Sequence, residues 1–559
     1  MNLKIFHYNL FSFNKFFFLK IMAQKLLLLG DEAIAQAAID AGLSGIYAYP
    51  GTPSTEITEF VQKSKEAKEK GIRSNWSANE KTAMEAALGM SYAGKRAMVC
   101  MKHVGLNVAA DPFLNSAITG ANGGLIVVVA DDPSMHSSQN EQDSRVLGKF
   151  ALVPILEPTN QQEAYDMVHY GFEISEKYQT PVLLRITTRL AHSRADVERK
   201  QSLPQNKINL PENLRQFVLL PAIARNRYKI LLSRQPDFNR ESETKGFNQY
   251  FDGSDKSLGI ITSGIAYNYL MENYPDNNIP YPVLKICQYP FPKPMFEKIY
   301  NDCENILVLE EGYPVIEEML RGILDNGKKI MGRLTGEVPR DGELNPVIVA
   351  KSIGIFHSDV KNVPPIVAPR PPQLCAGCPH IESVKFINNI INPNYTKGRV
   401  FSDIGCYTLA ALPPYETINS CVDMGASITM AIGAADAGIV PAIAVIGDST
   451  FTHSGMTGLL DAVNNNSPIT VVILDNATTA MTGGQESSAY GRLESICKGI
   501  GVDENHIKVL KPLKAHEKEN ERIFQEELNY DGPSVIITRR ECIQTISKKA
   551  KQKRGALVK

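Results

Sequence analysis

Short apolar runs that end in polar residues alternate with helix-like stretches along most of this chain. In the C-terminal half, residues 442–446 are apolar and stop at a turn that contains Asp448. A second apolar run, residues 469–474, stops just before Asn476. Apolar residues at helical spacing follow Ser454, which we expect to cap a helix between the two runs. The pattern predicts strand, helix and strand of a parallel sheet.

Polar groups stand where both predicted strands end. Ligands of parallel sheets bind at the carboxyl ends of the strands, so Asp448 and Asn476 are expected to point into one crevice. Carboxylate and amide oxygens suit Mg²⁺, which keeps its other positions for water and phosphate oxygens. We assign the flanking Gly447 and Ser449 to the same site. The arrangement resembles the thiamine diphosphate motif, a Gly-Asp pair followed by an Asn after the next strand. A turn in an unrelated α/β domain is the alternative.

A helix with small residues is expected at residues 77–89, with Glu80 at its start. Thiamine enzymes use a glutamate that protonates N1′ of the aminopyrimidine ring, and this segment resembles the helix that carries it. The small residues are expected to allow close packing; they are Ala83, Ala86, Ala87 and Gly89. The alternative is that Glu80 only complements the helix dipole.

A third candidate site follows the predicted strand at residues 45–49, in the sequence Pro-Gly-Thr-Pro-Ser-Thr. We expect Thr52 to cap a helix, with Pro53 at its first position. A helix N-terminus with hydroxyl groups forms an anion site that suits the carboxylate of a 2-oxo acid.

This run resembles the substrate loop of 2-oxoacid:ferredoxin oxidoreductases, in which the matching threonine contacts the substrate carboxylate. From about Ala23 to Cys542 the chain resembles the α subunits of the indolepyruvate ferredoxin oxidoreductases. The resembling stretches include KLLLLGDEAIAQAAIDAG, YAYPGTPSTE, MKHVGLNVAADP, HSSQNEQDSR, LCAGCPH and SDIGCYTLA. So many motifs in one order identify the chain as a member of this family.

The resemblance implies ferredoxin-dependent oxidative decarboxylation of arylpyruvates, such as indole-3-pyruvate, to aryl-acetyl-CoA. It implies thiamine diphosphate, Mg²⁺ and coenzyme A, a smaller β subunit, ferredoxin or an equivalent electron acceptor, and an α₂β₂ assembly. Glu80 would activate thiamine and Thr52 would orient the substrate carboxylate. His103 and His453 are candidate proton carriers, because imidazole titrates near neutral pH. A structural hydrogen bond is the alternative for each histidine.

Four cysteines form a further candidate site. Cys375 and Cys378 form a Cys-x-x-Cys pair, Cys406 follows Asp-Ile-Gly, and Cys542 follows the last predicted strand. Four thiolates suit a [4Fe–4S] cluster, and the resemblance implies that cysteines in this order hold one. Cys421 could replace Cys542. A zinc site is the rival, and its ligands would be Cys375, Cys378, His380 and Cys406.

Many α subunits of the family continue into a ferredoxin-like domain with two further cysteine runs, and this sequence ends at Lys559 without them. We therefore expect electrons to leave from the proximal cluster directly or through another protein. Two other readings stay open. One is a non-oxidative thiamine-dependent 2-oxoacid decarboxylase or synthase, and the other is a non-catalytic subunit that only carries a cluster.

Composition changes this picture little. The 559 residues are 43% hydrophobic and 21% charged with a net charge of −1, so nothing indicates nucleic acid binding. Nine cysteines spread over this length indicate a reducing cytoplasm rather than a secreted disulfide framework. Residues 1–21 are rich in Phe but interrupted by Lys and Asn. We expect a non-native or disordered extension with the native start at Met22 and no membrane span, a weak membrane anchor being the alternative.

The predicted fold is a multi-domain α/β chain, in which two doubly wound thiamine-binding domains flank a smaller α/β domain like the transketolase C-terminal domain. The expected segments are 1–21 (extension), 22–190 (pyrimidine-binding domain), 191–256 (linker), 257–361 (transketolase C-terminal-like domain), 362–373 (Pro-rich linker), 374–545 (diphosphate-binding domain with the cysteines) and 546–559 (basic tail, expected to be solvated and frayed).

Overall fold

The chain divides into two units, Met1–Lys361 and Asn362–Lys559. The computed structural model describes residues 25–211, 213–323, 327–355, 364–368, 373–395 and 398–557. The extension expected at 1–21, the expected start at Met22 and parts of the Pro-rich linker lie outside the described residues.

The first unit is built around a seven-stranded sheet in which the strands pair in parallel except at the β12 edge. Its order is β12-β6-β7-β5-β4-β2-β3. Alternate residues of the buried strand β4 enter different cores: Met98 and Cys100 join one, and Val99 and Met101 join the other. Both faces of the sheet are therefore covered, as in a doubly wound fold. The strands are β2 (Gly45–Ala48), β3 (Arg73–Trp76), β4 (Ala97–Lys102), β5 (Leu125–Asp131), β6 (Ile155–Leu156), β7 (Val182–Thr187) and β12 (Gln288–Tyr289).

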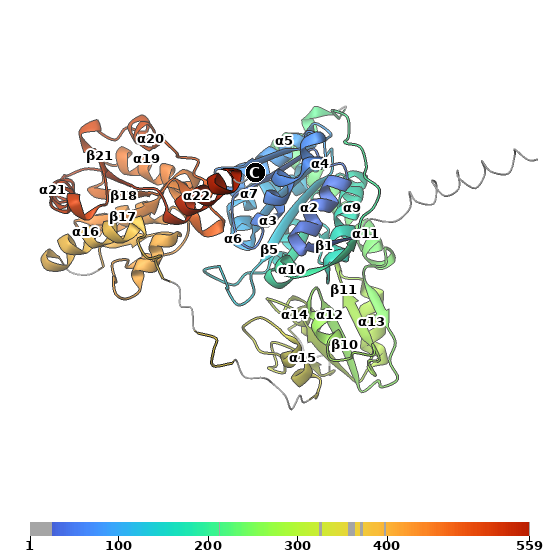
Figure 1. Ribbon diagram of the computed structural model, residues 1–559. Helices are drawn as coiled ribbons and strands as arrows, with labels where there is room; N and C mark the ends of the chain where they lie inside the picture. The colour runs from blue at the N-terminus through green and yellow to red at the C-terminus, as the bar shows by residue number, and fades with distance from the viewer. Residues whose placement is uncertain are drawn as a thin grey trace, which may run out of the picture. The chain divides into compact units, whose positions relative to one another are not determined.

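Two sets of helices cover these faces (Figure 1). One set supplies the first core and consists of α2 (Gly30–Asp40), α3 (Thr55–Lys63), α4 (Lys65–Glu69), α9 (Gln161–Tyr178) and α10 (Thr188–His192). The other set supplies the second core and consists of α5 (Glu80–Tyr92), α6 (His103–Val108), α7 (Ala110–Thr119), α8 (Ser144–Ala151) and α11 (Pro221–Thr244).

The segment expected as a linker, residues 191–256, is largely ordered structure. Strand β8 (Arg194–Glu198) pairs antiparallel with β1 (Lys25–Leu29) in a separate two-stranded sheet. The segment also holds the short helix η1 (Leu214–Phe217) and the 24-residue helix α11, which buries Leu231 and Phe238. Its charged composition reflects the exposed face of α11 rather than a free connection.

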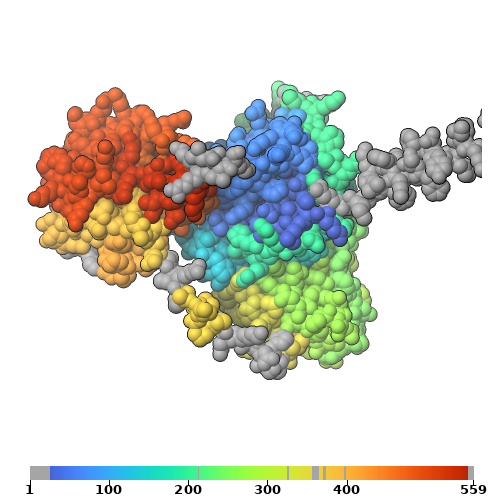
Figure 2. Space-filling model, viewed as in Figure 1, coloured from blue at the N-terminus to red at the C-terminus, as the bar shows by residue number. Residues whose placement is uncertain are grey.

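A smaller sheet completes the first unit, in the order β14-β13-β10-β11-β9. Strand β12 leaves this region and pairs antiparallel with β6 at the edge of the larger sheet. The green surface of the smaller sheet is continuous with the blue and cyan surface of the larger one (Figure 2). The elements are β9 (Gln249–Phe251), β10 (Leu258–Ser263), β11 (Val283–Ile286), β13 (Asn305–Leu309), β14 (Ile330–Met331), α12 (Ala266–Met271), α13 (Lys293–Asp302), α14 (Val315–Arg321) and α15 (Pro346–Ser352).

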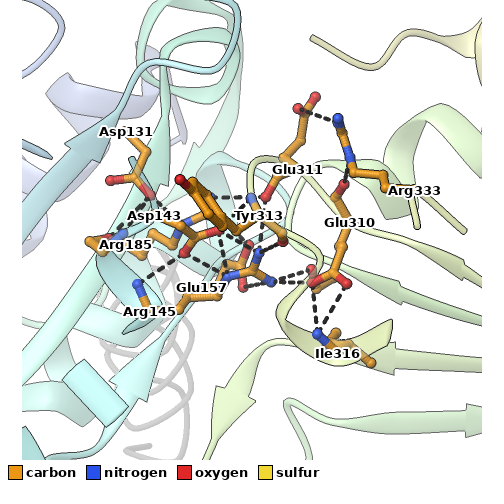
Figure 3. Close-up of polar contacts among 12 residues, drawn as sticks. Asp131, Asp143, Arg145, Glu157, Arg185, Glu310, Glu311, Tyr313, Ile316 and Arg333 are labelled. Atoms are coloured by element: carbon orange, nitrogen blue, oxygen red, sulfur yellow. Dashed lines mark hydrogen bonds and ion pairs between the residues drawn. The ribbon is translucent and has the colours of Figure 1, made fainter. Parts of the chain in front are cut away.

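Buried ion pairs join the two sheets of this unit (Figure 3). Arg145 Nη2 lies 2.6 Å from Asp143 Oδ2, and Arg145 Nη1 lies 3.0 Å from Glu310 Oε2 just after β13. Arg185 of β7 pairs with Asp131 of β5 at 2.6 Å and also with Glu157. We call the set Asp131, Asp143, Arg145, Glu157, Arg185, Glu310, Glu311 and Arg333 the buried ionic network.

The second unit contains a six-stranded sheet, parallel throughout, in the order β16-β15-β17-β18-β22-β21. Two cores again lie on opposite faces, one supplied by α16 (Pro379–Asn394) and α21 (Glu517–Leu528) and the other by α17 (Ala426–Asp436), α19 (Met456–Asn464) and α20 (Leu493–Ile500). The strands are β15 (Val400–Ser402), β16 (Ser420–Cys421), β17 (Ala442–Gly447), β18 (Ile469–Asp475), β21 (Ile507–Leu510) and β22 (Ser534–Arg539), with a separate pair β19 (Thr478–Thr479) and β20 (Gln485–Glu486).

The helices of the second unit are α16 (Pro379–Asn394), η2 (Cys406–Ala411), α17 (Ala426–Asp436), α18 (Asp448–Thr450), η3 (Phe451–Gly455), α19 (Met456–Asn464), η4 (Ala480–Thr482), α20 (Leu493–Ile500), η5 (Glu504–His506), η6 (Lys514–His516), α21 (Glu517–Leu528) and α22 (Ile543–Leu557). Residues 546–557, expected as a solvated and frayed tail, continue helix α22 to Leu557, and residues 546–551 are exposed as expected. Lys548 Nζ donates to the Gly483 carbonyl at 3.1 Å, which ties the helix to the β19–β20 region. Within the described ranges, no helix has the length and apolar composition to cross a membrane.

Candidate active site

The carboxyl ends of β17 and β18 carry the predicted Mg²⁺ ligands. The strands pair in parallel with Gly447 opposite Leu474, so Asp448 and Asn476 both follow at one edge of the sheet. Asp448 is 3% exposed, and its Oδ2 has no hydrogen-bond partner among the described residues. Burial raises the pKa of Asp448 to about 7, and the charge of the neighbouring Asp475 adds to the rise. A bound cation would satisfy the unpartnered oxygen and stabilise the ionised carboxylate.

Asn476 is held in one orientation by two contacts. Its Oδ1 accepts a hydrogen bond from the Thr478 backbone N–H at 3.1 Å, and its Nδ2 lies 3.1 Å from His380 Nε2. Burial lowers the pKa of His380 to about 4, so the imidazole is neutral and its Nε2 can accept from the amide. An amide oxygen has two lone pairs, and one stays available for a cation.

The helix after β17 begins at Asp448 itself, so the predicted cap at Ser454 is wrong. Gly447 has an extended backbone, and helical structure runs on through a π-helical turn that contains His453. Ser454 Oγ instead lies 2.7 Å from His453 Nδ1. His453 is buried, and π-helical turns inside α-helices are frequent at functional sites.

Asp403 and Tyr407 support the Gly-Asp turn, a role that was not predicted from the sequence. A Cβ atom on Gly447 would lie 2.8 Å from Tyr407 Cε1, so glycine is required for this approach. The Tyr407 hydroxyl donates to the buried Asp403, which also accepts from Ser427 Oγ at 2.6 Å. The feature that could have indicated this role is the position of Asp403 directly after β15, the strand that pairs with β17.

The four predicted cluster cysteines lie near one another. Burial raises the pKa of the Cys406 thiol to about 12, and Cys378, Cys542 and Cys375 contribute further. The Cys378 N–H donates to the Cys375 carbonyl at 2.9 Å, and the Cys542 N–H donates to the Asn476 carbonyl at 3.1 Å. The four thiols are therefore close enough to affect the pKa of Cys406, and the backbone of Cys542 is joined to that of Asn476.

Of the two alternatives to this set, Cys421 as the fourth ligand finds less support. Cys421 Sγ donates to the Asp403 carbonyl at 3.6 Å. Burial raises the pKa of the Cys421 thiol, and the other groups that affect this pKa are Thr408, Asp403 and Asp423 rather than thiols. The zinc alternative shares Cys375, Cys378 and Cys406 with this set and adds His380, whose Nε2 lies 3.1 Å from Asn476 Nδ2.

In the first unit, helix α5 begins at Glu80 as expected. The Asn79 side chain accepts from the Thr82 N–H at 2.9 Å, and Thr82 Oγ1 accepts from the Asn79 N–H at 3.3 Å, which forms a capping box. Glu80 is 5% exposed, and a Cβ atom on Gly105 would lie 2.6 Å from its Oε1. The backbone of α6 therefore packs directly on this carboxylate.

The small residues of α5 divide between its two faces. Ala83 and Ala87 are buried, as expected. Ala86 and Gly89 are exposed in this chain, and a Cβ atom on Gly89 would meet no atom within 4 Å. The expected close packing is therefore confirmed for half of the set.

Lys102 and His103 stand at the carboxyl end of β4. His103 Nε2 lies 3.1 Å from the Asn140 carbonyl, and its buried Nδ1 has no described hydrogen-bond partner. Lys102 Nζ donates to the Ser137 carbonyl at 2.9 Å; burial lowers the pKa of Lys102, while the charges of Asp132 and Glu80 oppose this. Lys102 is not among the residues predicted from the sequence, although a lysine at the end of an apolar strand can be recognised there.

Thr52 does not cap α3, so that prediction is wrong. Thr52 and Pro53 form a turn joined by a cis peptide bond, and the helix begins at Thr55. Thr55 Oγ1 accepts from the Gly51 N–H at 3.0 Å, and Ser54 Oγ donates to the Gly51 carbonyl at 2.9 Å. These two hydroxyl groups define the turn and leave Thr52 in the loop before the helix.

Two family models define the class of protein. "Pyruvate flavodoxin/ferredoxin oxidoreductase, thiamine diP-bdg" matches residues 36–222, and "Thiamine pyrophosphate enzyme, C-terminal TPP binding domain" matches residues 403–538. The first match contains Thr52, Glu80 and His103, and the second contains Asp448 and Asn476. With two doubly wound sheets, they confirm the α/β fold of thiamine-dependent oxidoreductases.

Relatives narrow the class further. Indolepyruvate oxidoreductase subunit IorA from Pyrococcus horikoshii is 40% identical over 93% of this chain and 86% of its own length. The subunit of the same name from Archaeoglobus fulgidus is 38% identical over 96% and 89%. A solved 2-oxoglutarate:ferredoxin oxidoreductase from Magnetococcus marinus covers 55% of this chain and 62% of its own, with 16% identity and a TM-score of 0.45. The chain belongs to the indolepyruvate oxidoreductase IorA family of 2-oxoacid oxidoreductases, which confirms the resemblance drawn from its motifs.

Proposed function

We propose that this chain oxidises arylpyruvates such as indole-3-pyruvate, and that its four cysteines hold a [4Fe–4S] cluster that receives the electrons. Family membership supports thiamine-dependent 2-oxoacid oxidation. The cluster, Mg²⁺ and transfer of the acyl group to coenzyme A go beyond that membership and are part of the proposal.

One observation carries the electron-transfer part. The Cys542 N–H donates to the backbone carbonyl of Asn476, whose side chain is a proposed Mg²⁺ ligand. A cysteine of the proposed cluster and a proposed cofactor-binding residue are therefore joined by one backbone hydrogen bond. Such proximity favours transfer of electrons from the bound cofactor to the thiol-bound irons.

Several residues of this chain would bind Mg²⁺ and thiamine diphosphate. Asp448 and Asn476 would hold Mg²⁺ through hard oxygen ligands, and Gly447 and Ser449 would line the diphosphate turn. Glu80 would hold a proton at N1′ of the aminopyrimidine, with Gly105 packed on it. When bound, thiamine diphosphate supplies an electron sink for the loss of CO₂, and the cluster takes up single electrons.

The loop before α3 would bind the substrate, and two histidines are the candidates for proton transfer. Thr52 would donate to the carboxylate of the 2-oxo acid from that loop. His103 and His453 are both buried, and they are the candidate proton carriers of this proposal. The proposal includes a smaller β subunit in an α₂β₂ assembly and ferredoxin or an equivalent protein as the electron acceptor, because relatives carry the name of a subunit.

The test is iron and sulfide analysis of the complex with its partner subunit after anaerobic purification. We expect about four irons and four sulfides per chain, and a spin signal after addition of thiamine diphosphate, Mg²⁺ and arylpyruvate. Cys542→Ser should lose iron and the signal, whereas the matched control Cys421→Ser should keep both. Iron loss in Cys421→Ser alone would overturn the assignment of the fourth ligand.

A second pair of variants tests the thiamine part. Glu80→Gln should abolish turnover while thiamine diphosphate still binds, and Glu85→Gln, an exposed residue of the same helix paired with Lys81, should leave both unchanged. Decarboxylation by an iron-free wild-type complex would instead favour a non-oxidative decarboxylase. Full turnover in Glu80→Gln would overturn the role of this glutamate.

A further inference from the structure

A cluster of three possible metal ligands lies in the first unit, outside the residues considered so far. Asp31 is in the first turn of α2, Glu56 is in the first turn of α3, and His192 is the last residue of α10. One ligand atom from each lies within 4.8 Å of the others. His192 Nε2 is 3.7 Å from Glu56 Oε2. Two ligands bound to one ion at about 2.0–2.2 Å lie roughly 3–4 Å apart, so small side-chain shifts would close this group on an ion.

The burial of Asp31 is an independent observation that points to a ligand. Asp31 is fully buried, and neither of its carboxylate oxygens has a hydrogen-bond partner among the described residues. Glu56 Oε2 makes no hydrogen bond there, and His192, at 3.7 Å, is its ion-pair partner. Burial of an ionised carboxylate with neither a hydrogen bond nor a counter-charge is unfavourable.

A second aspartate of the same helix shows what a satisfied carboxylate looks like. Asp40, at the other end of α2, is also fully buried. It accepts from the Tyr165 hydroxyl at 2.6 Å, from Arg199 Nε at 2.9 Å and from Gln36 Nε2 at 3.2 Å. Asp31 has no comparable partners in the described chain, and the nearby charges of Glu56 and Glu32 raise its pKa beyond the effect of burial.

From this arrangement we propose that Asp31, Glu56 and His192 bind a divalent transition-metal ion, of the class of Mn²⁺, Fe²⁺ or Zn²⁺. Two carboxylates with one imidazole suit these ions, whereas Mg²⁺ and Ca²⁺ prefer oxygen ligands alone. The ion neutralises the buried carboxylate. Three protein ligands leave further positions for water at the exposed side, where His192 lies.

The ion has a structural role next to the substrate loop. Glu56 directly follows Ser54 and Thr55, whose hydroxyl groups define the turn that contains Thr52. A metal bound by Glu56 joins the start of α3 to α2 and α10. It therefore holds the end of the loop in place, and this role is independent of the thiamine chemistry.

Equilibrium dialysis of the chelator-treated complex against Mn²⁺, with metal analysis, tests the proposal. The Asp448→Asn background and the omission of thiamine diphosphate remove binding at the cofactor site. We expect one Mn²⁺ per chain, bound at least about tenfold more weakly in His192→Gln and in Asp31→Asn. His136→Gln is the matched control, because His136 is a half-exposed histidine that contacts Glu343 at 3.2 Å, and it should bind Mn²⁺ normally.

Thermal unfolding gives a second readout that does not depend on activity. Mn²⁺ should raise the melting temperature of the Asp448→Asn protein and of His136→Gln, and should leave that of His192→Gln unchanged. Because His192 is exposed, its substitution leaves the core intact. Absence of stoichiometric Mn²⁺ binding, or equal Mn²⁺ binding by His192→Gln and the control, would overturn the proposal.

Discussion

The two units of this chain bury carboxylates in different ways. In the buried ionic network of the first unit, Asp143 pairs with Arg145 at 2.6 Å and Asp131 pairs with Arg185 at 2.6 Å (Figure 3). In the second unit, Asp448 is equally buried, but none of the described ion pairs includes it, and one of its oxygens has no partner.

This difference distinguishes carboxylates that stabilise the fold from carboxylates that are available to bind a ligand. A buried carboxylate with a guanidinium partner is satisfied by the fold, and its removal leaves the partner charge unpaired. A buried carboxylate without one has a free-energy cost that only a ligand or a proton can remove. Asp31 in the first unit resembles Asp448 in this respect, so the distinction follows the partners of each residue rather than the unit.

The largest expected effect comes from removing a cation of the network. Arg185→Met leaves Asp131 and Glu157 without this partner, and we expect the free energy of unfolding to fall by about 3–5 kcal/mol. Denaturant unfolding measures it. Arg189→Met, which breaks a more exposed pair with Glu343, is the control and should cost no more than about 1 kcal/mol. Equal losses in both variants would contradict a special role for the buried network.

Removal of the unpartnered carboxylate of Asp448 should weaken cofactor binding without destabilising the fold. Asp448→Asn should leave the free energy of unfolding unchanged or raised, because no cation loses its partner. It should weaken Mg²⁺-dependent binding of thiamine diphosphate by at least about 100-fold, measured by calorimetry. Asp461→Asn, an exposed aspartate of α19, should change neither quantity. A strongly destabilised Asp448→Asn protein with intact binding would break the comparison.

The smallest expected effect is a pH dependence within the network. Burial raises the pKa of Glu310 to about 7 against a usual value of 4.5, while Arg145 opposes the rise. The folded state therefore binds more protons than the unfolded state between these two values, and this group's contribution to stability falls as pH rises from about 4.5 to 7. Relative to Glu310→Gln, the wild type should lose about 2 kcal/mol between pH 5 and pH 7.5.

Unfolding in urea at the two pH values checks this prediction. Other carboxylates of the chain titrate in both proteins, so the difference between wild type and variant isolates Glu310. If the stability of the wild type relative to Glu310→Gln does not fall as pH rises, Glu310 is ionised in the folded state over the whole range.

Local patterns in the sequence predicted the parts of the candidate site that follow directly from the ends of elements. Residues 442–446 and 469–474 are strands, and Asp448 and Asn476 come after them because strand polarity and apolar runs are local properties. Glu80 was placed at a helix start by the same logic. The predicted cap at Thr52 is wrong because neighbouring hydroxyl groups, such as that of Thr55, form the turn instead. The predicted cap at Ser454 is wrong because helical backbone already begins after Gly447.

The sequence by itself determined the two doubly wound sheets, the positions of Asp448, Asn476 and Glu80, and the order of the cysteines. Only the tertiary structure decided which carboxylates have partners. Asp31 and Asp40 lie in one helix, and residues far away in the sequence, Tyr165 and Arg199 for Asp40, make the difference between them. The pairing of β1 with β8 and the buried ionic network are likewise contacts between distant segments. Charge and burial of such groups depend on folding in three dimensions, which no local pattern encodes.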